Sequence, residues 1–314
     1  MPKYRRRLPQ LSGDLFIADG GLETTLIFHH RIDLPEFAAF VLLQDNAGVE
    51  TLQRYFRDYA TLAQRYNVGL ILDSPTWRAN RDWGEKLGFT QTALADLNKR
   101  SIELLATIRD SMETDATRGV ISGCIGPRAD GYIPSRLMSA EEAAEYHFPQ
   151  IQTFAQTQAD MVTVLTMNYV EEAIGAALAA RSSGMPVAIS FTVETDGKLP
   201  TGDTLRDAIE RTDEATRSIP AYYMINCAHP MHFKQSLIPS GEWLSRIKGL
   251  RANASQRSHA ELNEATELDA GDPEQLGEEY RDLKTQLPHL SVLGGCCGAD
   301  QRHVRSEEHT SELQ

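Results

Sequence analysis

Three of the four cysteines in the chain lie in two short motifs that could bind a metal ion. Cys296 and Cys297 are adjacent in a Gly-Gly-Cys-Cys-Gly run, and Cys227 follows Asn226. Because successive residues of a strand point to opposite faces, adjacent thiols converge only where the backbone leaves strand geometry, and the flanking glycines permit such a bend. Catalytic zinc has three protein ligands and one open position, and zinc accepts thiolate ligands. We therefore expect Cys227, Cys296 and Cys297 to bind Zn2+.

Other interpretations of these cysteines stay open. A disulfide between Cys296 and Cys297 would join Cα atoms only about 3.8 Å apart, below the usual range of about 4.4–6.8 Å, and would be strained. Buried inert thiols are common, but they leave the glycines unexplained. His229 or His303 could supply a fourth ligand, which would close the site and make it structural. Cys124 is expected to be a small buried residue instead of a ligand.

The elements that must position these residues follow an alternating pattern. Short apolar or β-branched runs alternate with longer helical stretches, which is typical of βα units around a parallel sheet. The predicted strands are residues 15–18, 68–72, 119–123, 161–165, 187–191, 221–226, 247–251 and 290–293. The predicted helices are residues 48–66, 91–112, 140–158, 171–182, 204–215 and 273–284. Eight such units in about 300 residues predict an α/β protein with a single (β/α)8 TIM barrel.

The placement of the motifs agrees with a barrel. An open doubly wound sheet would carry a glycine fingerprint after its first strand, and Asp19-Gly20-Gly21 lacks that spacing. Barrel active sites lie at the carboxyl ends of the strands. Cys227 ends the sixth predicted strand and the cysteine pair follows the eighth, so the three thiols should meet at that face.

The end of the chain departs from the pattern. A barrel needs a last amphipathic helix over the seam between strands eight and one, but from residue 306 onward only Leu313 is apolar. We therefore expect a barrel domain over residues 1–305 with a truncated last helix, and a non-native tail over residues 306–314.

Charge and hydropathy narrow the class of partner. The 314 residues include 31 Lys and Arg against 44 Asp and Glu, a formal net charge of −13. This charge repels phosphate backbones and anionic lipids, so neither nucleic acid nor a membrane is an expected partner. The sequence has no apolar run near the roughly 20 residues that cross a bilayer and no signal-peptide hydrophobic stretch. We expect a cytoplasmic protein that acts on small molecules.

Together, three motifs resemble the homocysteine S-methyltransferase family over roughly residues 15–305: Asp19-Gly20-Gly21, Asn226-Cys227 and Gly294-Gly295-Cys296-Cys297-Gly298. The resemblance implies a zinc-dependent (β/α)8 barrel that transfers a methyl group to the sulfur of homocysteine. It implies that Cys227, Cys296 and Cys297 are the zinc ligands and that Asn226 belongs to the substrate site. Backbone N–H groups of Gly20 and Gly21 would bind the substrate carboxylate, and Asp19 would shape their loop. A plain turn is the alternative for these three residues.

One position departs from the family. Members commonly carry a glutamate at the end of strand four that binds the substrate amino group, and Leu165 stands at the matching place. An apolar side chain cannot bind an ammonium. Asp73 and Glu194, near the ends of strands two and five, are the candidate replacements, although an exposed loop position is the more usual fate of a carboxylate. Alternatively, the enzyme acts on a different thiol, or the barrel binds metal without catalysis.

The expected methyl donor is a sulfonium compound. Cobalamin and folate versions of the family chemistry rely on additional domains, for which this chain has no length left. The resemblance therefore implies S-methylmethionine or S-adenosylmethionine. Such a donor carries its methyl group on a positively charged sulfur, which an acidic protein does not repel.

Overall fold

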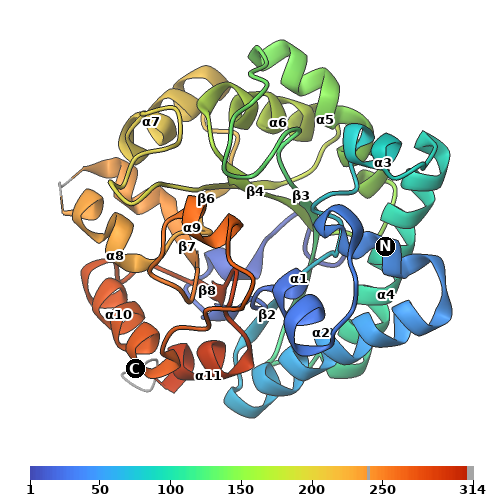
Figure 1. The fold of residues 1–314 in the computed structure, drawn as a ribbon, viewed down its shortest axis with the longest axis horizontal. Helices are drawn as coiled ribbons and strands as arrows, with labels where there is room; N and C mark the ends of the chain where they lie inside the picture. Colours follow the sequence, from blue (N-terminus) through green and yellow to red (C-terminus); the bar gives the residue numbers. More distant parts are fainter. Residues whose placement is uncertain (239–240, 310–314) are drawn as a thin grey trace.

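The computed structural model describes residues 1–238 and 241–309. Its eight strands are parallel, each pairs with its neighbours in sequence order, and the first pairs with the eighth, so the sheet closes on itself. Figure 1 shows the strands at the centre and the long helices around them. The predicted (β/α)8 barrel is confirmed.

The strands are β1 (Phe16–Ile17), β2 (Gly69–Asp73), β3 (Gly119–Ile125), β4 (Met161–Met167), β5 (Val187–Phe191), β6 (Tyr222–Asn226), β7 (Ile247–Ala252) and β8 (Val292–Gly295). The α-helices are α1 (Leu22–Thr24), α2 (Asn46–Tyr66), α3 (Arg81–Lys86), α4 (Gln91–Met112), α5 (Ala140–Ala155), α6 (Val170–Ser182), α7 (Leu205–Thr216), α8 (Pro230–Phe233), α9 (His259–Asn263), α10 (Pro273–Gln286) and α11 (Gln301–His309). Short 3-10 or π segments are η1 (Pro9–Leu11), η2 (Thr25–His29), η3 (Pro35–Phe37), η4 (Ala39–Gln44), η5 (Lys234–Leu237) and η6 (Glu242–Arg246). In the described part of the chain, none of these helices has the length and apolarity to cross a membrane.

The strands separate two apolar layers. Side chains at alternate positions fill the barrel interior, among them Phe16, Val120 and Met224, while their neighbours pack outward against the helices. Cys124 of β3 belongs to the interior layer and is buried, as expected. Leu165 of β4 lies in the same layer.

Side-chain caps explain why the predicted helix starts agree with the structure. The Asp45 carboxylate accepts a hydrogen bond from the Gly48 N–H at 2.8 Å and caps α2. Ser139 and Glu142 form a reciprocal capping box at the start of α5. Each cap satisfies a backbone donor that has no partner inside the helix. The helix α4 has the predicted bounds, whereas α5 ends at Ala155, three residues before the predicted end at 158.

The last helix, α11, contacts α10 on one side and α2 on the other, so it lies over the seam between β8 and β1. Val304 of this helix is fully buried. It extends to His309 and therefore crosses the expected domain end at residue 305. Residues 310–314 of the expected tail lie outside the described residues.

Candidate metal centre and substrate cavity

The three predicted ligands converge. Cys227 directly follows β6, and Cys296 and Cys297 directly follow β8. Their sulfur atoms lie within 4.8 Å of one another, and in the described residues no other such group of His, Cys, Asp or Glu side chains meets this spacing. The backbone N–H groups of Cys227 and Cys296 donate to the carbonyl groups of Arg251 and Ala252, so β7 holds both sides of the site. Three soft, closely spaced donors fit a zinc ion.

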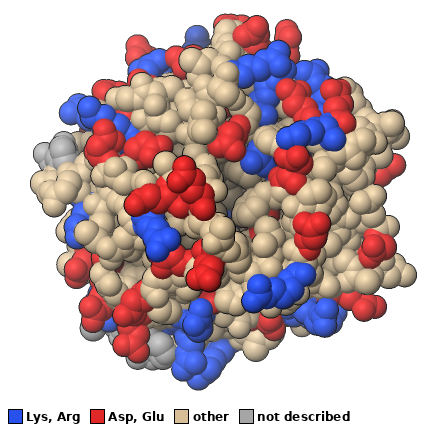
Figure 2. Space-filling model, viewed as in Figure 1, with Lys and Arg blue, Asp and Glu red and all other residues tan. Residues whose placement is uncertain are grey.

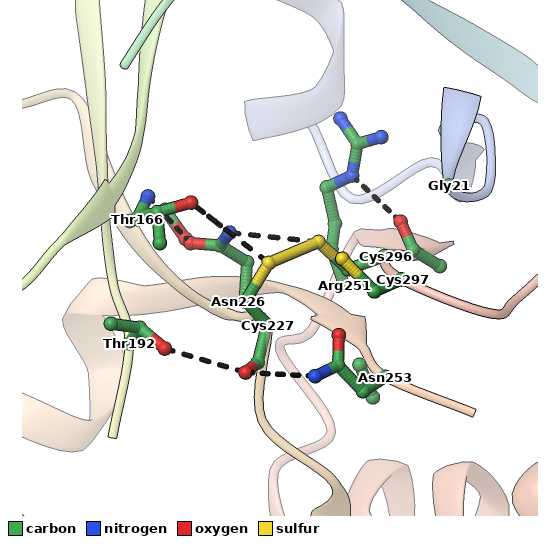
Figure 3. The surroundings of a disulfide bond; sticks show 12 residues. Gly21, Thr166, Thr192, Asn226, Cys227, Arg251, Asn253, Cys296 and Cys297 are labelled. Carbon is green, nitrogen blue, oxygen red and sulfur yellow. Dashed lines mark hydrogen bonds between the residues drawn. A yellow bond between two sulfur atoms is a disulfide. The ribbon is translucent and has the colours of Figure 1, made fainter. Parts of the chain in front are cut away.

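Two of the three sulfurs also form a disulfide. Cys227 and Cys296 are bonded, with their Cα atoms 5.4 Å apart, and Cys297 remains free beside them (Figure 3). The disulfide considered from the sequence, between the adjacent Cys296 and Cys297, is not formed. Because metal ligation requires thiolates, the disulfide and a three-thiolate site are alternative states of the same residues.

Neither histidine considered as a fourth ligand joins this group. His229 accepts a hydrogen bond from the Met231 N–H at 3.3 Å, and burial lowers its pKa to about 4. His303 lies 3.2 Å from the Asp300 carboxylate and 2.8 Å from the Ala270 carbonyl.

The glycine pair serves close packing. A Cβ atom at Gly20 would lie 2.4 Å from the Ala299 carbonyl oxygen, and one at Gly21 would lie 2.5 Å from that of Cys296. The Gly21 N–H donates to the Ala299 carbonyl at 2.8 Å. Of the two N–H groups expected to bind a substrate carboxylate, that of Gly21 therefore already has an acceptor within the protein. The loop after β1 is instead bound to the loop after β8.

The structure places Asp19 and Asp73 on either side of Arg251, at the carboxyl ends of β1, β2 and β7. Arg251 is 5% exposed, pairs with Asp19, and donates to Asp73 Oδ2 at 2.5 Å. Burial opposes the charge on Arg251, but the two carboxylates outweigh burial and raise its pKa. Burial raises the pKa of Asp19, while Arg251 opposes that rise. Asp73 Oδ1 is buried and has no hydrogen-bond partner.

Asn226 connects the ends of two strands. Its Oδ1 accepts hydrogen bonds from the Thr166 N–H at 2.9 Å and the Ser190 hydroxyl at 2.6 Å, and its Nδ2 donates to Thr166 Oγ1 at 2.8 Å. Thr166 and Cys227 both have positive φ angles, 61° and 54°, which non-glycine residues rarely adopt. Figure 3 shows Asn226 lying between Thr166 and the sulfur atoms. Asn226 thus supports the site through its neighbours.

Glu194 is linked to Cys227 through His259. Its carboxylate is 3.1 Å from His259 Nδ1, and His259 Nε2 is 2.6 Å from the Cys227 carbonyl oxygen. The His259 ring stacks on Tyr132, with centroids 3.8 Å apart, and the Tyr132 hydroxyl lies 3.6 Å from Cys297 Sγ. Burial raises the pKa of the Cys297 thiol to about 11, and the Tyr132 hydroxyl opposes this rise.

A cavity of about 460 Å3 opens at the carboxyl ends of the strands, next to the sulfurs. Asp73, Leu165 and Asn226 line it, whereas Glu194 does not. Figure 2 shows the hollow near the centre of this face, with acidic side chains beside it. The wall also includes residues that the sequence analysis did not single out: Glu23, Phe28, Trp77, Arg78, Tyr132 and Arg251. Only Arg251 carried a signal, because a charged residue in a predicted buried strand requires a partner.

The closed barrel, the cavity at its strand ends and the three convergent cysteines define a barrel enzyme with a three-sulfur site. The model of the homocysteine S-methyltransferase family matches residues 16–309. The chain belongs to this family and is a methyltransferase.

Solved structures agree in fold. The chain is similar to the homocysteine methyltransferase MmuM from Escherichia coli in its oxidized form, with 18% identity, a TM-score of 0.74, and coverage of 96% of this chain and 99% of that chain. The metallated form of MmuM gives 18% identity, a TM-score of 0.73, and coverage of 94% and 96%. A comparison with curated proteins finds no match.

Proposed function

We propose that this methyltransferase transfers a methyl group from a sulfonium donor, S-methylmethionine or S-adenosylmethionine, to the sulfur of homocysteine, with zinc held by Cys227, Cys296 and Cys297. The observation that carries the proposal is the convergence of these three sulfurs within 4.8 Å beside the cavity. Reduction of the disulfide would precede metal binding, since all three ligands must be thiolates.

When bound, zinc would lower the pKa of the acceptor thiol, so that the thiolate is available at neutral pH. The thiolate attacks the methyl carbon in line with the bond to the donor sulfur. One carbon–sulfur bond forms, the other breaks, and its electron pair stays on the donor sulfur, which becomes a neutral thioether. The cavity walls hold the two substrates in this alignment and keep water away. The methyl transfer itself needs no general base.

Asp73 is the proposed partner of the homocysteine ammonium. Leu165 lines the cavity but offers no charge. Asp73 lines the same cavity, is 5% exposed, and has one carboxylate oxygen without a partner. An ammonium there would satisfy this oxygen. Glu194, the other candidate, lies outside the cavity wall and beside His259.

Metal analysis tests the zinc ligands. Reduced protein dialysed against zinc is expected to retain one ion per chain, and Cys227→Ser or Cys296→Ser should lose most of it because each removes one of three ligands. Protein oxidised to the disulfide should bind none. Cys124→Ser is the matched control, because Cys124 is a free, buried cysteine outside the sulfur group. Undiminished zinc in either ligand variant would refute the assignment.

Product analysis tests the reaction. Zinc-loaded protein is incubated with homocysteine and each sulfonium donor, and methionine is the expected product. Leu165 favours a second candidate function, methyl transfer to a thiol without an amino group, so a panel of such thiols is assayed in parallel. If only thiols of that panel are methylated, the acceptor is one of them and not homocysteine. Full zinc occupancy without turnover on any thiol would favour a metal-binding barrel.

A further inference from the structure

Glu23 is a carboxylate in the cavity wall that the proposed reaction has not yet used. It lies in α1, directly after the glycine pair. The Thr24 hydroxyl donates to the Gly21 carbonyl at 3.0 Å and accepts from the Gly298 N–H at 3.2 Å. These bonds attach α1 to the loop that carries Cys296 and Cys297, so the position of Glu23 relative to the sulfurs is fixed.

Among the described residues, Glu23 has no ion-pair partner. In the same part of the chain, no hydrogen bond from another residue reaches its carboxylate; its own backbone N–H stabilises the charge, and Arg78 and Arg251 act on it only through their more distant charges. Burial raises its pKa to about 7. Other acids at this face have cationic partners: Asp130 lies 3.6 Å from Arg78, and Asp19 pairs with Arg251. A half-buried carboxylate without a partner is costly unless a ligand supplies the cation.

The surroundings favour a soft organic cation. The cavity wall contains six carboxylates against two guanidinium groups, and apolar or aromatic side chains including Ile27, Phe28 and Trp77 line the same space as Glu23. Among the described residues, two carboxylates of this wall, Glu23 and the exposed Glu267, form no ion pair. Asp73 pairs with Arg251 through Oδ2, and its buried Oδ1 has no hydrogen-bond partner. The proposed reaction brings two cationic groups, the ammonium of the acceptor and the sulfonium of the donor.

The position of Glu23 distinguishes between these two groups. Asp73 ends a barrel strand, whereas Glu23 lies on a helix beyond the strand ends. The acceptor sulfur must reach the cysteines, and the donor sulfur must follow it in line, one methyl group farther out. Glu23, Cys296 and Cys297 line the same cavity. A sulfonium next to the acceptor sulfur would therefore occupy the cavity whose wall includes Glu23.

We propose that Glu23 is the counter-ion of the donor sulfonium and makes the cavity selective for a charged methyl donor over its neutral thioether product. This inference rests on the proposed function. The transfer removes the positive charge from the donor sulfur, so the attraction by Glu23 is present before the reaction and absent after it. Because the attraction is weaker in the transition state than in the ground state, Glu23 contributes donor affinity and product release rather than the rate of methyl transfer.

Steady-state kinetics on the zinc-loaded enzyme tests this role. Glu23→Gln is expected to raise the KM for the sulfonium donor about tenfold, to leave kcat within about twofold, and to leave the KM for homocysteine unchanged. Glu23→Asp retains the charge and should recover most of the donor affinity. Glu267→Gln is the matched control, since it removes an exposed carboxylate from the same cavity wall and should change the donor KM less than about twofold.

Calorimetry on the reduced protein gives a readout without turnover. The wild type should bind S-adenosylmethionine at least about tenfold more tightly than S-adenosylhomocysteine, and S-methylmethionine more tightly than methionine. Glu23→Gln should reduce each preference to about twofold, and the pair that shows the larger preference identifies the donor. If Glu23→Gln leaves unchanged both the KM for a donor that is turned over and the binding preference for that donor over its product, this inference alone is overturned. A rise in the homocysteine KM instead would also overturn it, whereas absence of methyl transfer in the wild type would overturn the proposed function.

Discussion

At the scale of single residues, the Asp19–Arg251–Asp73 cluster contributes to the charge of the cavity wall. One guanidinium shared by two carboxylates leaves the cluster with one net negative charge when all three groups are ionised. Asp73 lines the cavity, and its Oδ1 is buried without a hydrogen-bond partner. The cluster therefore attracts a cation while Arg251 keeps the second carboxylate paired.

Replacing Asp73 by Asn is expected to raise the KM for homocysteine by about one to two orders of magnitude, the loss of one charge-assisted hydrogen bond. Asparagine keeps the shape of the side chain and an oxygen for Arg251. Initial rates over a homocysteine series provide the measurement. Glu194→Gln is the control, because Glu194 faces His259 instead of the cavity. Unchanged homocysteine kinetics in Asp73→Asn would mean that another group recognises the amine.

Arg251 also shows which contacts between side chains cannot be predicted from the sequence. The positions of Cys227, Cys296 and Cys297 after predicted strands indicated that they would meet, because a barrel brings the carboxyl ends of all its strands to one face. The pairing of Asp19 with Arg251 joins residues 232 positions apart, and no periodic pattern encodes which side chains pair across the barrel. The sequence therefore placed Glu194 near the end of β5, but it did not show that the carboxylate contacts His259 instead of lining the cavity.

At the scale of elements, the ends of β4 and β6 depend on each other. Thr166 and Cys227 have backbone conformations that cost energy for residues with a Cβ atom. The Asn226 side chain compensates part of this cost through its two hydrogen bonds to Thr166. The cysteine at the end of β6 is thus positioned by a neighbouring strand.

The variant Asn226→Ala is expected to lower zinc affinity by about 10- to 100-fold, as removal of supporting groups around metal ligands does, and to reduce the free energy of unfolding by about 1–3 kcal/mol. Competition with a chromogenic chelator and urea denaturation measure the two effects. Ser190→Ala removes only one of the hydrogen bonds to Asn226 and should have the smaller effect on both. Equal zinc affinity in wild type and Asn226→Ala would show that Cys227 is held without Asn226.

The elements that the sequence did not predict are short. The helices α1, α3, α8 and α9 have three to six residues and lie within loops. An apolar stripe with a period of 3.6 residues needs more length to be visible. The long helices α2 and α4 had enough length and a capping residue, so their bounds were predicted within two residues.

At the scale of the whole molecule, closure of the barrel between β8 and β1 involves α11 and Asp300, the residue before this helix. Burial opposes the charge of the Asp300 carboxylate, but its hydrogen bonds to His303 and Arg302 hold its pKa well below the usual range. His29 of η2 lies 3.7 Å from the same carboxylate and connects it to the other side of the seam. Asp300 therefore helps to attach the last helix to the start of the barrel.

Asp300→Asn is expected to lower the free energy of unfolding by about 1–2 kcal/mol at pH 7. Since the pKa in the folded state lies below the unfolded value of about 3.9, the stabilisation is fully present above that value and is lost as the pH falls toward the folded pKa. Urea denaturation of both proteins from pH 7 to pH 3 measures the difference, which should shrink below about pH 4. A difference that does not change with pH would mean that the carboxylate acts by packing alone.

The loop between β8 and α11 belongs to both the proposed metal site and the barrel seam. Cys227 precedes Cys296 by 69 residues, and the Gly21 N–H finds its acceptor only at Ala299. During synthesis on a ribosome, the nascent chain therefore has neither a ligand set nor a closed barrel until β8 has emerged. If the three cysteines bind zinc as proposed, completion of the metal site and completion of the fold are a single event, so capture of a metal ion would mark a finished barrel.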